Sequence, residues 1–260
     1  MEYASRTSKG ARGYQEDAAR VQAGPGSLDS PAAEQQGSAD QLTAVLADGM
    51  GGHAGGALAS NTACRVFLRA YEMAVGDVRS RLGEALQLAN AAIAACVDDN
   101  PALNGMGCTL VGAVFGPAGL EWVSVGDSPL FLVRRGEIFL LNEDHSLAPE
   151  IDKLAAAGKM SWEDAHADPR RHFLRSALTG SDIDLIDRSR SPLALEPDDV
   201  VLICSDGIHT LSHADILRVT VERAAEGPAA VADALLAAVD AAGDIYQDNT
   251  TVVSVRVRRN

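Results

Sequence analysis

The sequence predicts an α+β fold in which antiparallel sheets pack face to face and helices cover them. Between Gly107 and Leu141, four β-rich runs follow one another with only short turns between them. Two other stretches, 57–98 and 212–242, place apolar residues at the three- and four-residue spacing of helices. Strands joined by tight turns pair antiparallel, whereas a doubly wound parallel sheet needs a helix between successive strands. The pattern therefore favours a sandwich.

Composition limits the classes of partner. The chain has 260 residues, of which 47% are hydrophobic, so it can form a substantial core. Its 36 acidic and 22 basic residues give a formal net charge of −14, which disfavours nucleic acid phosphates and anionic membranes. No apolar run approaches the roughly 18 residues of a membrane span, and Met1–Arg6 lacks the apolar core of a signal peptide. We expect a monomeric cytoplasmic protein without a nucleic-acid or membrane partner.

Four isolated cysteines indicate thiols and not a metal or disulfide framework. None belongs to a C-x-x-C pair, and each lies among apolar residues. They are Cys64, Cys96, Cys108 and Cys204. We expect reduced side chains in the core.

The first part of the chain alternates short strands with polar segments. We expect strands at 2–9 and 18–22, and a buried strand in the apolar run 42–46. Residues 22–41 are rich in Gly, Pro, Ser, Ala and Gln, which predicts a surface loop without a packed role. Five glycines then follow within the eight residues 49–56, where they let the backbone approach a ligand closely.

The middle of the chain begins with two helices and continues with strands. Apolar residues recur at helical spacing over 57–75 and 79–98, which predicts two packed antiparallel helices. Gly116–Gly119 marks a hairpin between two of the strands that follow. The four predicted strands are 108–115, 120–125, 130–133 and 137–141.

The last part of the chain starts with an insertion and returns to strands. Short helices and polar turns dominate 142–180, including an amphipathic stretch at 147–157 that Gly158 ends. The five apolar residues 200–204 fit a strand buried on both faces. The remaining expected elements are a strand near 183–190, helices at 212–225 and 228–242, and a last strand at 251–257.

Four acids, Asp48, Asp127, Asp206 and Asp248, each lie at the boundary of a predicted strand. If the sheets pack face to face, such strand ends gather at one rim, where carboxylates repel each other and favour a bound cation. Oxygen ligands favour Mg²⁺ or Mn²⁺ over zinc. Asp and Gly also dominate ordinary turns, so spacing alone leaves open a set of solvated turn residues.

Seven ordered motifs resemble those of the bacterial PPM-type (type 2C) metal-dependent protein serine/threonine phosphatases. They are Arg12…Glu16-Asp17, Asp48-Gly49-Met50-Gly51-Gly52-His53, Gly107-Cys108-Thr109, Gly126-Asp127-Ser128, Asp144-His145-Ser146, Ser205-Asp206-Gly207 and Asp248-Asn249-Thr250-Thr251. The resemblance implies one domain over 1–260, built as a four-layer αββα sandwich of two antiparallel sheets flanked by helix pairs. It also implies a small helical flap at about 142–180.

The resemblance implies hydrolysis of phosphoserine and phosphothreonine in proteins. Water or hydroxide that bridges two Mn²⁺ or Mg²⁺ ions would attack the phosphate directly. Its partners would be phosphorylated proteins and a cognate Ser/Thr protein kinase. Asp48 resembles the carboxylate that bridges both ions, Asp206 and Asp248 resemble further ligands of the first ion, and Glu16 and the carbonyl of Gly49 match the site of the second.

The remaining site residues also come from the resemblance. Arg12 matches the residue that grips the phosphate, Asp17 an acid that orients metal-bound water, and His53 the general acid that protonates the leaving alkoxide. Asp127 resembles a ligand of a third, weaker ion. Thr210 stands where the family commonly has aspartate, which puts the third ion in doubt.

Two other functions remain open on the sequence. A catalytically idle domain of the same family would serve as a signalling or scaffold module, but it would not need the crowded acids. A metal-dependent hydrolase of small phosphoesters would need the same acids. The sequence names neither the substrate nor the physiological metal.

Overall fold

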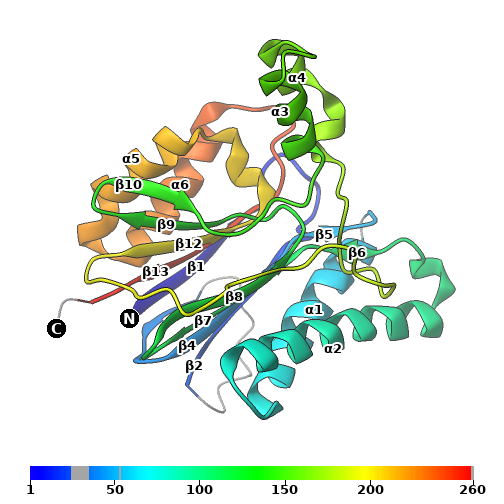
Figure 1. Ribbon diagram of the computed structural model, residues 1–260, viewed down its shortest axis with the longest axis horizontal. Helices are drawn as coiled ribbons and strands as arrows, with labels where there is room; N and C mark the ends of the chain where they lie inside the picture. Colours follow the sequence, from blue (N-terminus) through cyan, green and yellow to red (C-terminus); the bar gives the residue numbers. More distant parts are fainter. Residues whose placement is uncertain (25–34, 53, 259–260) are drawn as a thin grey trace.

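The computed structural model describes residues 1–24, 35–52 and 54–258. Two antiparallel sheets pack against each other (Figure 1). The six-stranded sheet has the order β10 (Glu137–Leu140), β9 (Leu130–Arg134), β12 (Val200–Cys204), β13 (Thr250–Arg256), β1 (Glu2–Ser8) and β3 (Gln35–Ser38). The five-stranded sheet has the order β11 (Asp187–Arg188), β8 (Gly119–Val125), β7 (Leu110–Gly116), β4 (Leu42–Ala47) and β2 (Ala18–Ala23). A two-stranded ladder joins β5 (Gly49–Met50) to β6 (Gly107–Cys108).

A helix pair covers the outer face of each sheet (Figure 1). Helices α1 (Ala54–Met73) and α2 (Val78–Asp99) pack on the five-stranded sheet, and α5 (His213–Arg223) and α6 (Pro228–Ala242) pack on the six-stranded sheet. This arrangement confirms the predicted α+β sandwich. Helices α3 (Ala148–Ala156) and α4 (Trp162–Ala167) project from it. Short 3₁₀ helices lie at Pro101–Leu103, Pro169–His172, Asp206–Thr210 and Ala224–Glu226.

The core is built by strands buried on both faces. All six residues of β4 are buried, and alternate side chains point to opposite sides of a strand. Val45 and Ala47 therefore pack with the α1 and α2 cluster, whereas Ala44 and Leu46 pack between the two sheets. Strand β12 divides its side chains in the same way. Such rigid strands fix the positions of the loops at their ends.

The structure corrects three predicted elements. Within the predicted loop 22–41, residues 35–38 form β3, which pairs with β1, while 25–34 lie outside the described residues. An edge strand needs only main-chain pairing on one side and can remain polar, so it lacks an apolar pattern. The strand predicted at 108–115 breaks at Thr109 into β6 and β7.

The strand predicted near 183–190 shortens to β11 at 187–188. The preceding turn is held by a side chain and not by a neighbouring strand. Asn90 on α2 donates from Nδ2 to Ser181 O at 2.7 Å and accepts from Gly180 N at 2.9 Å.

The cysteines are free thiols, as predicted. Cys64, Cys108 and Cys204 are buried, and Cys96 is half-buried. Across 1–24, 35–52 and 54–258, no helix combines the length and the apolar character needed to cross a membrane.

Candidate active site

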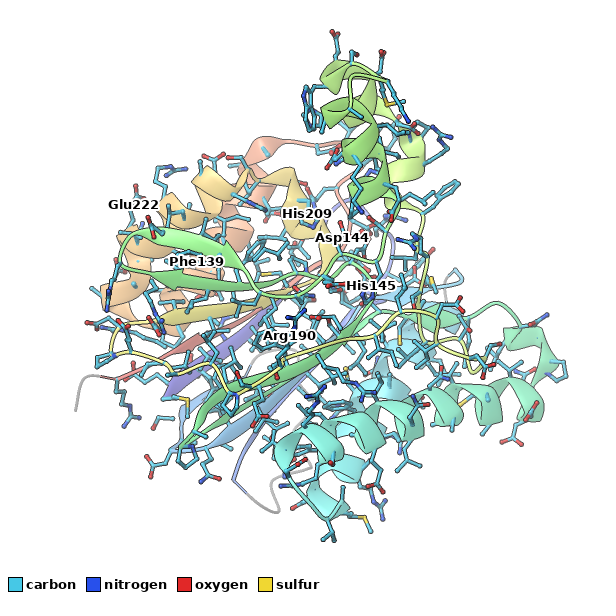
Figure 2. All side chains as sticks on the ribbon, in the orientation of Figure 1. Phe139, Asp144, His145, Arg190, His209 and Glu222 are labelled. Carbon is cyan, nitrogen blue, oxygen red and sulfur yellow. The ribbon has the colours of Figure 1, made fainter. Side chains whose placement is uncertain are left out.

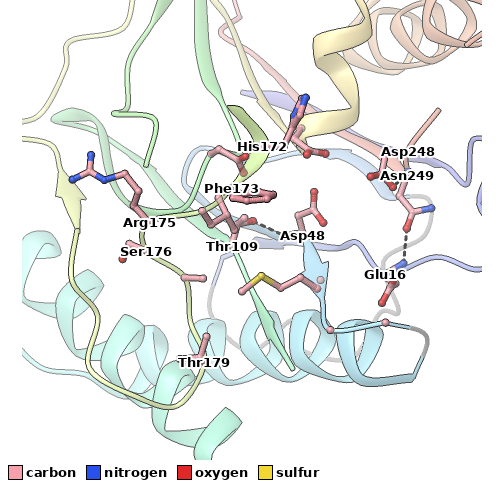
Figure 3. Close-up of a pocket in the computed structure, with 18 of the residues that line it drawn as sticks. Glu16, Asp48, Thr109, His172, Phe173, Arg175, Ser176, Thr179, Asp248 and Asn249 are labelled. Carbon is pink, nitrogen blue, oxygen red and sulfur yellow. Dashed lines mark hydrogen bonds between the residues drawn. The ribbon is translucent and has the colours of Figure 1, made fainter. Parts of the chain in front are cut away.

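The ends of several strands place acids around one cavity. Asp17 precedes β2, Asp48 follows β4, Asp127 precedes β9, Asp206 follows β12 and Asp248 precedes β13. The cavity has a volume of about 870 Å³ (Figure 3). Its lining includes Arg12, Glu16, Asp48, Gly49, Asp127, Asp206 and Asp248. The structure thus brings together residues predicted from separate motifs, whereas Asp17 is buried and does not line the cavity. Their individual roles remain predictions.

The acids are held in an environment that disfavours their charge. Burial raises the pKa of Asp17 to about 7, although hydrogen bonds from Ser205 and Thr251 oppose this shift. Burial and the nearby Asp206 carboxyl raise the pKa of Asp127 to about 8. Burial and the neighbouring Asp17 carboxyl raise the pKa of Asp48 well above its ordinary value. The repulsion among these groups stores unfavourable energy that a cation would relieve.

Asp48 and Asp206 show this frustration most clearly. Burial raises the pKa of each carboxyl, with the nearby Asp17 adding to the rise at Asp48 and Asp248 adding to the rise at Asp206. Oδ1 of Asp206 is buried and has no hydrogen-bond partner among the described residues. One oxygen of Asp17, Oδ1, is also buried and accepts no hydrogen bond in the described structure. These hard oxygen donors suit Mg²⁺ or Mn²⁺.

The acids do not form a finished coordination sphere. Among the residues that the structure describes, no three Asp, Glu, His or Cys side chains converge closely enough to hold one ion. Asp248 turns instead to Arg12, whose Nη2 lies 2.6 Å from Asp248 Oδ2. Both side chains are partly exposed, at 49% and 40%, so this ion pair adds little to stability. The candidate phosphate-binding residue and a candidate metal ligand therefore neutralise each other.

A layer of hydroxyl groups fixes the loop of Asp48 to the loop of Asp127. The backbone N–H of Asp48 donates to Thr109 Oγ1 at 3.0 Å, as Figure 3 shows. That hydroxyl lies 2.7 Å from Ser128 Oγ, and the pair is buried. Thr109 interrupts the predicted strand at this point, and its hydroxyl accepts the hydrogen bond from the loop of Asp48.

The glycines of the predicted ligand-binding loop permit a close approach between segments. A Cβ atom at Gly49 would collide with the carbonyl groups of Gly56 and Glu16, and one at Gly56 would collide with the Glu16 carboxyl. The N–H of Glu16 donates to Asn249 Oδ1 at 2.7 Å (Figure 3). Glu16 is thus packed against the start of α1 and tied to the loop that carries Asp248. His53 lies outside the described residues, and its role as general acid remains a prediction.

The flap, residues 142–180, supplies a wall that the sequence did not identify. The side chain of Phe173 is 61% exposed and lines the cavity together with His172 and Arg175 (Figure 3). Main-chain bonds hold this wall: Leu147 N donates to Phe173 O at 3.0 Å, and Arg175 N donates to His145 O at 2.8 Å. No apolar periodicity marks such an exposed wall residue in the sequence.

Buried His145 joins the flap to the Asp127 loop. Its Nδ1 accepts from Gly126 N at 3.2 Å, and burial lowers its pKa, so the ring favours its neutral form. Asp144 and His145 lie near the base of the flap, with His209 close by (Figure 2). Here a second chamber of about 660 Å³ opens beside the acids. It shares Arg12, Asp127, His172, Asp206 and Asp248 with the first cavity.

Comparison with known proteins identifies the family. The family model for protein phosphatase 2C matches residues 21–240. The chain belongs to the protein phosphatase 2C family. This membership confirms the resemblance found in the ordered motifs.

Named relatives and solved structures of this protein phosphatase 2C chain agree with that assignment. It is 36% identical over 165 residues to the serine/threonine protein phosphatase PstP of Mycobacterium tuberculosis, covering 63% of this chain but only 31% of that relative. It is 33% identical over 174 residues to a Listeria monocytogenes serine/threonine phosphatase, covering 65% of this chain and 67% of that relative. The crystal structure of M. tuberculosis PstP matches with a TM-score of 0.78 and 30% identity, covering 99% of this chain and 98% of that chain.

A further PstP structure is described as the catalytic domain in complex with two manganese ions. It matches at a TM-score of 0.74 and 30% identity, covering 98% of this chain and 97% of that chain.

Proposed function

We propose that this protein is a metal-dependent serine/threonine protein phosphatase, a phosphoric monoester hydrolase. The observation that carries the proposal is the crowding of Asp48, Asp127, Asp206 and Asp248 around one cavity, where Oδ1 of Asp206 is buried without a hydrogen-bond partner in the described structure. A scaffold module has no need for such mutual repulsion. The names of the relatives and the two manganese ions of the PstP catalytic domain support the same function.

The donor set fits two Mn²⁺ or Mg²⁺ ions. Asp48, Asp206, Asp248, Glu16 and the carbonyl of Gly49 would hold them. When bound, such a pair lowers the pKa of a shared water and offsets negative charge on the phosphate. Metal binding by Asp248 would then weaken its ion pair with Arg12, because the ion and the guanidinium compete for the same carboxylate.

The protein's own groups would orient the substrate and the attacking water. Arg12, which lines the cavity, would present a guanidinium fork whose planar geometry matches two phosphate oxygens. Ser205 and Thr251 hold Oδ2 of Asp17 at 2.7 Å each, so Oδ1 is left to accept a hydrogen bond from the water. His53 would protonate the departing serine or threonine oxygen, which is otherwise a poor leaving group.

The shape of the site favours a polypeptide over a small phosphoester. The second chamber lies beside the cavity and shares five of its lining residues, so chain on both sides of a phosphorylated residue would find space. Exposed Phe173 offers an apolar surface that a small polar ester would not use. We therefore propose phosphorylated proteins as substrates and a cognate Ser/Thr kinase as the enzyme that produces them.

The organisation of the molecule enters the same proposal. Residues 1–260 would form one catalytic domain with a flap at about 142–180, because the candidate acids come from segments as far apart in the chain as Asp17 and Asp248. The free thiols fit a reducing compartment such as the cytoplasm. Size-exclusion chromatography with light scattering would test the predicted monomer.

The decisive test is phosphate release from a phosphothreonine peptide with Mn²⁺, with Mg²⁺ and with excess chelator. We expect release with either ion and none with chelator. A parallel assay on glucose 6-phosphate distinguishes the small-ester hydrolase, which would prefer that substrate. A correctly folded, Mn²⁺-loaded protein that is inactive on both would support the idle module and contradict the proposal.

A further inference from the structure

A buried glutamine connects the loops that carry two of the candidate metal ligands. Gln247 lies just before β13 and is 6% exposed. Its Oε1 accepts a hydrogen bond from Thr210 Oγ1 at 2.6 Å. Its Nε2 contacts Gly207 O at 3.0 Å, Asp248 O at 3.2 Å and Thr250 Oγ1 at 3.1 Å. One amide thus joins the segment after Asp206 to the segment that contains Asp248.

The backbone of the same residue holds the segment before Arg12. The carbonyl of Gln247 accepts from Ala11 N at 2.9 Å. Gly10 adopts a φ of +57°, and a Cβ atom there would collide with the carbonyls of Gln247 and Asp248. The chain therefore passes too close to Gln247 for any larger residue. Three segments that bear candidate site residues meet at this one position.

These three segments need such a tie because of the charges that they carry. The 3₁₀ helix 206–210 and the turn before β13 lie beyond the last ladder hydrogen bonds of their strands. Asp206 and Asp248 both line the cavity, and carboxylates that share a site repel each other. Without a restraint, that repulsion would drive the loops apart. An amide restrains them without adding charge.

We propose that Gln247 is a positioning residue that holds Asp206 and Asp248 close enough to bind one cation. Thr210 fixes the orientation of the amide, because its hydroxyl donates to Oε1 and leaves Nε2 facing the two carbonyls. The proposal rests on the proposed metal site and adds to it a residue outside the ligand set. A glutamate at 247 would lose the Nε2 donor, and an apolar residue would lose every side-chain bond.

The test compares Gln247→Met with Gln22→Met. Gln22 is equally buried, at 6%, but lies toward the far end of β2 from Asp17. Calorimetric titration of the chelator-treated proteins with Mn²⁺ gives the affinity, and thermal melting without metal gives the stability. We expect Gln247→Met to weaken Mn²⁺ binding by about 10- to 100-fold, as is usual for residues that orient ligands. Gln22→Met should lower the melting temperature and leave Mn²⁺ affinity unchanged.

Kinetics and a second variant separate positioning from general damage. For Gln247→Met, the Mn²⁺ concentration at half-maximal activity should rise in parallel with Kd, whereas KM for p-nitrophenyl phosphate at saturating Mn²⁺ should stay unchanged. Thr210→Val should weaken Mn²⁺ binding only a few-fold. In the Gln247→Met background it should add nothing, because Thr210 acts through the amide.

Unchanged Mn²⁺ affinity in a normally melting Gln247→Met protein would overturn the proposal, and so would an equal loss in Gln22→Met. If Gln247→Met does not fold, Thr210→Val decides, and unchanged affinity in that variant would overturn it. A protein whose Mn²⁺ affinity depends on Gln247 but which releases no phosphate from phosphothreonine peptide would instead refute the proposed function.

Discussion

Strands β9 and β12 carry charged residues at both ends, in opposite electrostatic settings. At the cavity, Asp127 precedes β9 and Asp206 follows β12, and each acid faces other acids. At the far end, Arg134 closes β9 and Asp199 precedes β12. There the guanidinium of Arg134 binds both carboxylate oxygens of Asp199, at 2.8 and 2.5 Å. Asp199 is only 2% exposed, so burial alone does not distinguish the two ends.

The two ends differ in the charged group that contacts each acid. At the far end, the two-pronged hydrogen bonding to Asp199 raises the pKa of Arg134. Asp127 and Asp206 have no arginine partner in the described structure, and burial raises the pKa of both. One end of the strands therefore stabilises the fold, whereas the other sacrifices stability to prepare a cation site.

Removing a candidate ligand should have the largest effect on activity. Asp206→Asn and Asp248→Asn each withdraw a negative oxygen from the metal site. We expect phosphopeptide turnover to fall by about 10³-fold, equivalent to several kcal/mol of charge stabilisation. Melting temperatures without metal should stay the same or rise, because repulsion decreases. Near-normal turnover at limiting Mn²⁺ would remove these residues from the ligand set.

His53→Ala separates proton donation from metal binding. A nitrophenolate leaves without a proton, whereas a threonine alkoxide does not. We expect a loss of ~10²-fold or more on phosphothreonine peptide and a much smaller loss on p-nitrophenyl phosphate. Parallel kinetics on both substrates measure the ratio. Equal losses would indicate damage to the glycine loop instead.

The pH dependence of stability should reveal the repulsion among the acids at the cavity end of the strands. Asp17 and Asp127 have folded pKa values of about 7 and about 8, raised above their ordinary 3.8. Between pH 4 and 8 the folded state therefore binds more protons than the unfolded state, so the free energy of unfolding falls as pH rises. We expect a decrease of a few kcal/mol in chelator. Urea titrations at several pH values measure it, and saturating Mn²⁺ should abolish the decrease.

At the far end, Asp199→Asn should affect stability and not catalysis. The change leaves the Arg134 guanidinium short of a charged acceptor and should lower the free energy of unfolding by about 2 kcal/mol. Turnover per folded molecule and Mn²⁺ affinity should stay at the level of the unmodified protein. A change in Mn²⁺ affinity would show that the two ends of the strands are coupled.

The smallest effect concerns the third ion. Fewer anionic oxygens mean weaker binding of a hard dication, so a third Mn²⁺ should bind only at high concentration. Thr210→Asp should strengthen that site, and Asp127→Ala should weaken it while the metal pair stays. Since Thr210 donates to Gln247, the aspartate variant should also melt lower. Crystals soaked across a Mn²⁺ series would show the occupancy; a third ion at low Mn²⁺, indifferent to Thr210→Asp, would contradict this.

The acids at the strand ends were predictable because two local signals coincide there. An apolar run such as Val200–Cys204 marks a strand, and the Ser-Asp-Gly that follows it marks where the strand stops. The family motifs then matched these acids in their order along the chain. The buried strands could be located for the same reason, since apolar runs and strict alternation report burial directly.

Other parts of the site depend on contacts between distant segments. Nothing near Gln247 indicates that it meets Thr210, and nothing near Arg12 indicates that it pairs with Asp248. Such polar contacts have no periodicity. The edge strand β3 was missed because its pairing uses the main chain, which every sequence provides. Phe173 on the flap was also missed, because it is exposed and hydrophobic periodicity identifies only buried side chains.

The order of strands in the six-stranded sheet also determines when the site can assemble. Strand β13 lies between β12 and β1, and Arg256 pairs with Glu2 from the opposite end of the chain. During synthesis, β1 and β3 must wait for β13 before they can join β9, β10 and β12. Pairings of such high contact order form slowly. The nascent chain therefore cannot assemble the candidate cation site until β13 has left the ribosome.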